Sequence, residues 1–315
     1  MLSSRLVFPV NRMTLLCVVF LLFSACEAKL QLPQDVVIKA VFAFGDSIVD
    51  QVEDLGIKEL MPAYFDPNLE VEDLKSGVSF ASGASGYDLL TAITATAIPL
   101  SAQLLLFQQY KLKLEGLIGE EEANSIVKNS LFVIVTGSDD LVNTYFTLKF
   151  PRKWQYDIDS YTNLMVNGAS NFVQDLYNLG ARRIWVFGIP PIGCLPSQRQ
   201  KNGGLARVCV EEYNQAAQMA NTKLAAKIDS LSEILPQSEL VYINVYDPLL
   251  DLIVNPDKYG FEEVKRCCCR PGNNKFLLCD NHTGTCEDDT KYLFWDGYHL
   301  TEKGYRVLLD QIFKK

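Results

Sequence analysis

Residues 42–56 read FAFGDSIVDQVEDLG, and in this stretch an apolar segment runs directly into a polar turn. Its first residues end a run of apolar and β-branched side chains, residues 36–44, which is typical of a strand covered on both faces of a parallel sheet. Gly45 allows a sharp exit from that strand, and a helix-like segment begins near Ile48. Ser47 is therefore expected just past the carboxyl end of a strand, where parallel sheets bind their ligands.

Further short segments rich in β-branched or aromatic residues follow, and longer stretches with helical periodicity separate them. The expected strands are residues 36–44, 78–81, 131–136, 183–188 and 240–245. The expected helices are residues 102–118, 160–179 and 208–234, and a final amphipathic helix opened by Thr301. Strands that alternate with helices predict an α/β fold, a three-layer α/β/α sandwich with a mostly parallel five-stranded sheet.

The first 28 residues have the pattern of a secretory signal peptide. Arg5 and Arg12 precede the apolar run MTLLCVVFLLF at residues 13–23, and small residues ending at Ala28 follow it. The apolar run is too short to span a bilayer comfortably. We therefore expect cleavage after Ala28, export, a single domain over residues 29–315 and no stable membrane insertion.

The formal net charge of −9 argues against a nucleic-acid partner. Proteins that bind nucleic acids need a basic face to meet the phosphates, and this chain has an excess of acidic residues. The net charge excludes few other classes of protein.

Ser47 has two possible roles at this stage. Ser47 or Asp46 can simply cap the helix that follows, which is a common use of both residue types. Ser47 can also be a nucleophile, but a serine hydrolase needs a base and a group that orients the base. The chain has two histidines, and one of them, His282, lies inside the sequon Asn281-His282-Thr283 in a cysteine-rich loop. His282 is therefore a poor candidate for the base.

The other histidine, His299, lies in the stretch FWDGYHLTEKGY with Asp296 three residues before it. This spacing allows the carboxylate to bond Nδ1–H and to hold Nε2 toward a nucleophile. A solvated histidine near a helix N-terminus would show the same pattern. Taken together with Ser47, however, the pattern favours a triad of Ser47, His299 and Asp296.

Two glycine-containing stretches follow expected strands. SFASGASGYD carries Gly83 and Gly86, and VIVTGSDDLV carries Gly137. Each glycine fits an ordinary tight turn. Because the ends of parallel strands meet at one edge of the sheet, these glycines can also supply backbone N–H groups to an oxyanion hole near Ser47.

These motifs together resemble the plant GDSL esterase/lipase family of SGNH hydrolases, in its extracellular-lipase-like branch. The matching blocks are FGDS, FASGASG, VTGSDDL, GIPPIGCLPSQR and WDGYHLTEKGY, and the resemblance runs from about residue 36 to the C-terminus. It implies an SGNH or flavodoxin-like sandwich and hydrolysis of carboxylic esters. It also implies small-molecule ester or acyl-lipid substrates, a monomer and an extracellular location in the apoplast or cell wall.

The resemblance assigns roles to individual residues. Ser47 is the nucleophile, His299 the general base and acid, and Asp296 the carboxylate that orients it. The backbone N–H of Ser47 and that of Gly86, with Gly83 as the second choice, line the oxyanion hole. The resemblance implies no metal and no cofactor.

The cysteines are also interpreted through the resemblance. Cys17 and Cys26 leave with the signal peptide, so seven of the nine cysteines remain and one is odd. By residue type, Cys268, Cys269, Cys279, His282 and Cys286 fit a zinc site, but export and the resemblance favour disulfides. The expected pairs are Cys194 with Cys209, and Cys268 and Cys269 with Cys279 and Cys286 in one of two connectivities. Cys267 is then the odd thiol, and Asn281 is an expected glycosylation site.

One departure from the family pattern falls in the oxyanion hole. The third block usually reads Gly-x-Asn-Asp, and Asp139 stands here in place of the asparagine that donates to the oxyanion. An ionised carboxylate has no N–H to give. Asp139 can act there only if it is protonated, or Asn143, four residues later, can supply the donor. Asp139 and Asp140 as a glycosidase pair form a distant alternative, because adjacent residues rarely converge on one bond.

A second departure follows Ser47. SIVDQ runs almost directly into VEDLGIKELMPAY, whereas the family has a glycine- and asparagine-rich loop and a block like GRFSNG in between. That segment would shield the nucleophile from water. The sequence therefore leaves open a catalytically impaired paralogue that acts as a binding or structural protein, or a truncated gene model.

Overall fold

The computed structural model describes residues 37–48, 61–147, 152–269, 278–279 and 283–313. Its centre is a sheet of four parallel strands in the order β1-β2-β3-β4. The strands are β1 Val41–Gly45, β2 Leu131–Val135, β3 Arg183–Phe187 and β4 Glu239–Ile243. All four coincide with segments in which the sequence predicts strands. The N-terminal residues with the signal-peptide pattern lie outside the described residues.

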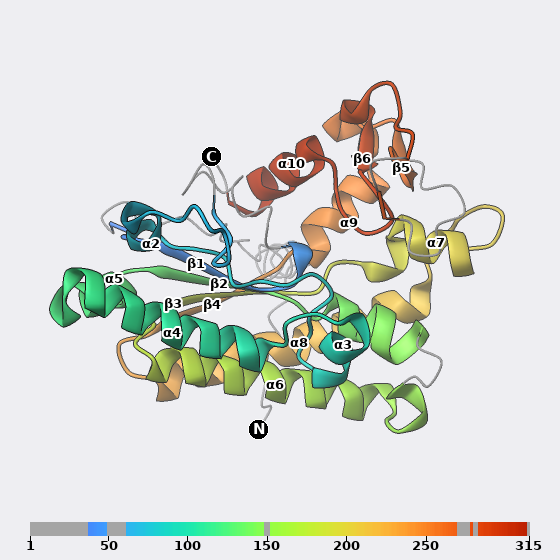
Figure 1. Ribbon diagram of the computed structural model, residues 1–315. Helices are drawn as coiled ribbons and strands as arrows, with labels where there is room; N and C mark the ends of the chain where they lie inside the picture. The colour runs from blue at the N-terminus through green and yellow to red at the C-terminus, as the bar shows by residue number, and fades with distance from the viewer. Residues whose placement is uncertain (1–36, 49–60, 148–151, 270–277, 280–282, 314–315) are drawn as a thin grey trace, which may run out of the picture.

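Helices cover both faces of this sheet, which gives the three-layer α/β/α sandwich that the sequence predicts. Figure 1 shows α4, α6 and α8 on one side of the strands, and α9 and α10 on the other. These helices are α4 Leu100–Ile118, α6 Ile158–Asn178, α8 Glu211–Ile234, α9 Tyr246–Val254 and α10 Glu302–Ile312. The shorter helices are α2 Val71–Ser76, α3 Leu89–Ala95, α5 Glu120–Lys128 and α7 Pro196–Asn202. As expected, Thr301 caps α10, and its hydroxyl accepts a hydrogen bond from the Gly304 N–H.

Alternate residues of β1 face the two layers, which is why the strand reads as a continuous apolar run. Phe42 and Phe44 pack against α4 and α6, where Phe42 meets Phe107 at 5.4 Å between ring centroids and Phe44 meets Phe172 at 5.5 Å. Val41 and Ala43 belong to the opposite core, together with residues of α9 and α10. β1 is thus fixed from both sides up to the residue before Asp46.

The fifth expected strand, residues 78–81, pairs with β1 but is irregular. Ser79 forms isolated parallel bridges with Ala43 and with Ala63. The Phe80 N–H donates to the Ala43 carbonyl at 2.8 Å, and the Ser82 N–H donates to the Gly45 carbonyl at 3.0 Å. The spatial order is then residues 78–82, β1, β2, β3, β4, the order of a doubly wound sheet whose ligand crevice lies beside the first strand.

A small parallel sheet that the sequence analysis did not identify lies near the C-terminus. It pairs β5 Glu263–Cys267 with β6 Tyr292–Phe294. Beyond β6 the chain returns against itself, because Phe294 bridges Leu300 and the Trp295 N–H donates to the His299 carbonyl. This return forms a short loop, residues 295–299, which carries both Asp296 and His299.

Within the described residues, no single helix is long and apolar enough to cross a membrane. Helices α3 and α4 reach the required length and composition only as a pair, and they are bent by 89° where they meet.

Asp140 links the loop before α3 to the helical segment after β2, where residues Asp140–Thr147 form a π-helix. Its carboxylate is fully buried and accepts hydrogen bonds from the Tyr87 N–H at 2.8 Å, the Asp88 N–H at 3.0 Å and the Thr91 hydroxyl. Burial raises the pKa of Asp140 to about 7, although these hydrogen bonds lower it. The Asp140 side chain therefore holds the loop before α3 against the helical segment after β2.

Asp140→Ala is expected to lower the free energy of unfolding by about 3 kcal/mol at pH 5, because the substitution removes the partner of the Tyr87 and Asp88 N–H groups and leaves a buried cavity. Since folding raises the pKa of this carboxyl above its unfolded value of about 4, its pH-dependent stabilisation is complete below pH 4 and decreases as the pH rises toward 7. Urea titrations at pH 5 and pH 8 measure this, and the loss should be larger at pH 5. The exposed Asp229→Ala is the control, with an expected change within about 0.5 kcal/mol. An equal loss in both variants would contradict the assignment.

Candidate active site

The turn after β1 presents Ser47 at the sheet edge. Gly45 has a φ of 122°, and a Cβ added to it would lie 1.9 Å from the Val135 carbonyl oxygen, so only glycine fits there. Asp46 is buried, and its Oδ1 accepts a hydrogen bond from the Ile48 N–H at 3.0 Å. Asp46 therefore makes the local capping contact, and the Ser47 hydroxyl is left for another partner.

That partner is His299, which is 252 residues away in the chain. Ser47 Oγ lies 2.8 Å from His299 Nε2. His299 Nδ1 lies 2.9 Å from Asp296 Oδ2 and 3.0 Å from Oδ1. A carboxylate can only accept hydrogen bonds, so Nδ1 carries the proton in the neutral imidazole and Nε2 accepts from the Ser47 hydroxyl. The structure thus brings together the three residues that the sequence predicts as a triad.

The Asp296 carboxylate is held by the loop that carries it. Its Oδ1 accepts hydrogen bonds from the backbone N–H groups of Tyr298 and His299, each at 2.8 Å. The side chain of Asp296 is 7% exposed and that of His299 is 21% exposed. The charge of the carboxylate is therefore shielded from water, and one edge of the imidazole remains accessible.

A glutamine that was not predicted from the sequence holds the backbone two residues before Ser47. Gln103 lies on α4 and is fully buried. Its Oε1 accepts from the Gly45 N–H and its Nε2 donates to the Gly45 carbonyl, both at 2.9 Å. A lone polar residue on the buried face of α4, between Leu100 and Phe107, is the sequence signal that marks it.

The two glycines expected at the oxyanion hole lie in different surroundings. A Cβ added to Gly83 would lie 3.5 Å from Ser47 Cβ, so Gly83 is directly beside the serine. A Cβ added to Gly86 would lie 2.2 Å from Asp140 Oδ1, so Gly86 packs against the buried carboxylate. The oxyanion role of either glycine stays a prediction, and the closeness of Gly83 to Ser47 favours Gly83 over Gly86. Gly137, the third glycine considered, packs against Ile189 and Tyr87.

Asp139 lies where the family pattern has asparagine, and it is close enough to His299 to interact with it electrostatically. Burial raises the pKa of Asp139 to about 6, and the charge of His299 lowers it. Burial, and then the charge of Asp139, raise the pKa of Asp46 well above its usual range. The Asn143 amide donates to Asp139 Oδ1, so the side chain that could supply an oxyanion donor is bound to that carboxylate.

The two alternative chemistries find little support in this geometry. The Asp140 carboxylate is fully buried and is occupied by backbone and Thr91 donors, so it is not available to pair with Asp139 across a substrate. Among the described residues, no group of His, Cys, Asp and Glu side chains is arranged to hold a metal ion. His282, a member of the suggested zinc set, lies outside the part of the chain that the structure describes.

The cysteines of that suggested set are joined to one another instead. The structure pairs Cys268 with Cys286 and Cys269 with Cys279, and it pairs Cys194 with Cys209. Cys267 is the free cysteine among the described residues. The Cys268 N–H donates to the Phe294 carbonyl at 2.9 Å and the Cys269 N–H to the Trp295 carbonyl at 2.8 Å. These disulfides are therefore anchored directly beside the loop that carries Asp296 and His299. The glycosylation residue Asn281 lies outside the described residues.

Comparison with known proteins identifies the family. The sequence profile of the GDSL-like lipase/acylhydrolases matches residues 41–312. The chain belongs to the GDSL lipase/acylhydrolase family. GDSL esterase/lipase EXL3 of Arabidopsis thaliana is 44% identical over 346 residues, which cover 96% of this chain and 94% of the relative. GDSL esterase/lipase EXL2 of the same plant is 44% identical over 275 residues, which cover 82% of this chain and 72% of the relative.

The comparison within the GDSL family also bears on the short connection after Ser47. The alignment with EXL3 extends over 346 residues, although this chain has only 315, so EXL3 contains internal residues that have no counterpart here. This agrees with the family segment that the sequence analysis finds missing. Residues 49–60, where the segment would begin, lie outside the described residues.

Proposed function

We propose that this protein is an exported serine esterase that cleaves carboxylic esters through an acyl-serine intermediate on Ser47. The observation that carries the proposal is the 2.8 Å contact between Ser47 Oγ and His299 Nε2 in a chain of the GDSL family. A nucleophile within hydrogen-bond reach of a base, which is itself oriented by a third group, is the arrangement that acyl transfer requires.

In the first half of the reaction, Ser47 Oγ attacks the ester carbonyl carbon and its proton passes to His299 Nε2. Asp296 accepts from Nδ1–H and stabilises the imidazolium that forms. The oxyanion lies toward the backbone N–H groups of Ser47 and Gly83. His299 then gives the proton to the departing alcohol oxygen, and the acyl group stays on Ser47. In the second half, water takes the place of the serine hydroxyl, and the same residues release the carboxylic acid.

The substrates we propose are small-molecule esters, acyl lipids or acylated wall components, and the location is extracellular. The basic and apolar N-terminus supports export, and so do the disulfides and the Asn281 sequon. We propose that the protein acts as a monomer with a single catalytic domain over residues 29–315.

A second candidate is an impaired member of the family that binds ester ligands but turns them over slowly. Two observations favour it. Asp139 replaces the family's asparagine donor, and EXL3 has internal residues that this chain lacks.

Labelling with a fluorophosphonate probe tests the proposal, because such probes react with activated serines. We expect stoichiometric labelling of the folded protein, complete loss in Ser47→Ala, and unchanged labelling in Ser230→Ala, an exposed serine on α8. Folded protein that remains unlabelled, but still binds ester ligands, would support the impaired candidate. Labelling that persists in Ser47→Ala would refute the assignment of Ser47.

A further inference from the structure

A closed ring of hydrogen bonds joins the turn after β1 to the segment that contains α3. Gln103 on α4 makes three of these bonds. Its Oε1 accepts from the Gly45 N–H and its Nε2 donates to the Gly45 carbonyl, both at 2.9 Å, and Nε2 also donates to the Ile98 carbonyl at 3.0 Å. The Ile98 N–H donates to the Ser82 hydroxyl at 3.0 Å. The Ser82 N–H donates to the Gly45 carbonyl at 3.0 Å, which closes the ring.

The ring lies next to two groups of the proposed reaction. Gly45 precedes Ser47 by two residues, and Ser82 immediately precedes Gly83. A Cβ added to Gly83 would lie 3.5 Å from Ser47 Cβ, so the two segments lie against each other at this point. The bonds that Gln103 makes therefore hold the turn of the nucleophile at a fixed separation from the backbone of Gly83.

A glutamine side chain matches the backbone groups at this position. Its amide has one acceptor oxygen and two N–H donors, and Gln103 uses all three. The side chain is fully buried, so water does not replace a lost partner. A carboxylate has no donor for the two carbonyls, and a thioether is only a weak acceptor. Other side chains of similar length therefore cannot make the same set of bonds.

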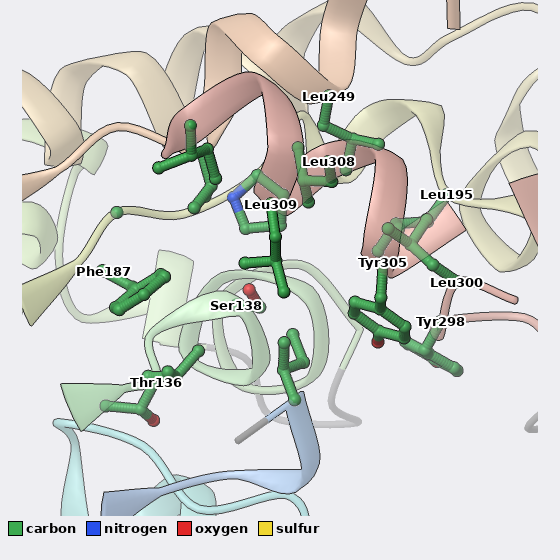
Figure 2. A pocket seen from close by; sticks show the side chains of 16 residues that line it. Thr136, Ser138, Phe187, Leu195, Leu249, Tyr298, Leu300, Tyr305, Leu308 and Leu309 are labelled. Carbon is green, nitrogen blue, oxygen red and sulfur yellow. The ribbon is translucent and has the colours of Figure 1, made fainter. Parts of the chain in front are cut away.

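The opposite side of the turn packs against apolar side chains. Ile48, which follows Ser47, lines a cavity together with residues of α9 and α10, among them Leu249 and Leu309 (Figure 2). Such packing excludes water but is non-directional. Hydrogen bonds have preferred distances and angles, so the bonds from Gln103 restrict the direction of the turn more closely than this packing does.

We propose that Gln103 is a positioning residue, which fixes the separation between Ser47 Oγ and the Gly83 N–H. This inference rests on the proposed function, in which the first group attacks the ester carbonyl and the second stabilises the oxyanion. Both must meet the same carbonyl group, and a donor stabilises an oxyanion only within a narrow range of distances. A displacement of about 1 Å can cost roughly a hundredfold in rate. Gln103 acts through Gly45, so its loss should affect the transition state more than the binding of substrate.

Gln103→Met tests the proposal, because it keeps the length of the side chain and removes its donors and its strong acceptor. We expect kcat for p-nitrophenyl acetate to fall by about tenfold to a hundredfold, while KM stays within about twofold. An alkyl boronic acid, which forms a tetrahedral adduct with an activated serine, should lose affinity by the same factor as kcat/KM. A rise in KM with kcat unchanged would overturn the proposal.

Two control variants separate positioning from stability. Leu231→Ala removes a buried side chain of α8 outside the ring, so it should destabilise the fold and leave kcat per folded molecule unchanged. Gln109→Met repeats the substitution at an exposed position of α4 and should change neither stability nor kcat. A loss of kcat in Leu231→Ala as large as that in Gln103→Met would show that kcat only follows stability, which would refute the positioning role.

A double-mutant cycle tests the ring itself. Ser82→Ala removes the acceptor of the Ile98 N–H and should lower kcat by about threefold to tenfold. The double variant Ser82→Ala/Gln103→Met should stay within about twofold of Gln103→Met, because the ring is then already open. Losses that multiply would show that the two residues act separately, and the ring would not be the positioning element.

Amide hydrogen exchange separates this inference from the proposed function, because it requires no turnover. In Gln103→Met the Ser82 N–H should exchange about tenfold faster relative to the Val133 N–H in β2, and Gln109→Met should leave this ratio unchanged. Faster exchange in a protein that hydrolyses nothing would refute the proposed function and leave Gln103 as the residue that positions the turn. Hydrolysis by the wild-type protein with kcat unchanged in Gln103→Met would refute the positioning role and leave the esterase proposal intact.

Discussion

His299→Ala is expected to lower kcat for p-nitrophenyl butyrate by a factor of about 10⁴ or more. The substitution removes the group that takes the Ser47 proton and returns it to the leaving alcohol. With His299 absent, the serine hydroxyl has no base within the described residues at hydrogen-bond distance. Residual hydrolysis would come only from binding and from the oxyanion donors.

The matched control is His282→Ala, the same substitution at the other histidine of the chain, which should leave kcat within twofold. Asp296→Asn gives a second check, since it keeps the shape of the loop but disturbs the imidazole tautomer, with an expected loss near 10⁴. Initial rates at saturating substrate measure all three. A loss below tenfold in His299→Ala would show that the hydrolysis has another base.

Asp139→Asn should raise kcat by about 10²–10³ above pH 7 and change it little below pH 5. Burial raises the pKa of Asp139 to about 6. Below that pH the carboxyl is protonated, and its O–H can donate to the oxyanion. Above it the carboxylate is ionised and repels the oxyanion. The asparagine amide donates at every pH, so the ratio of variant to wild-type kcat should rise through pH 6.

The ratio of variant to wild-type kcat is compared because several titratable groups surround Asp139. Asp46, Tyr298 and His299 all interact electrostatically with Asp139. Full pH–rate profiles of the two proteins provide the measurement, with Asp310→Asn, an exposed acid on α10, as the control for the loss of one charge. A ratio that stays constant from pH 4 to pH 9 would show that Asp139 does not act on the oxyanion.

The strands and the main helices could be predicted because their signals are local. The run of apolar residues in β1 and the helical spacing of apolar residues in α4 can each be recognised within a short stretch of sequence. The triad could be predicted for a different reason, since only two histidines had to be weighed and one of them had a carboxylate three residues before it.

The remaining features depend on contacts between distant segments. The bond from Gln103 to Gly45 spans 58 residues, and those that Asp140 accepts from Tyr87 and Asp88 span more than fifty. Each residue can be marked in the sequence, Gln103 as a polar residue on a buried helix face and Asp140 within a family block, but the sequence does not show which backbone groups it binds. The choice between Gly83 and Gly86 stays a prediction for the same reason, because it depends on which glycine meets Ser47 and which meets Asp140.

The paired disulfides beside the loop of residues 295–299 have a consequence for how the enzyme matures. Cys268 and Cys269 hold the carbonyls of Phe294 and Trp295, immediately before Asp296. We expect the serine to be positioned as soon as the main sheet folds, whereas the imidazole reaches it only once these bonds have formed. A chain in which these disulfides are reduced should then be latent.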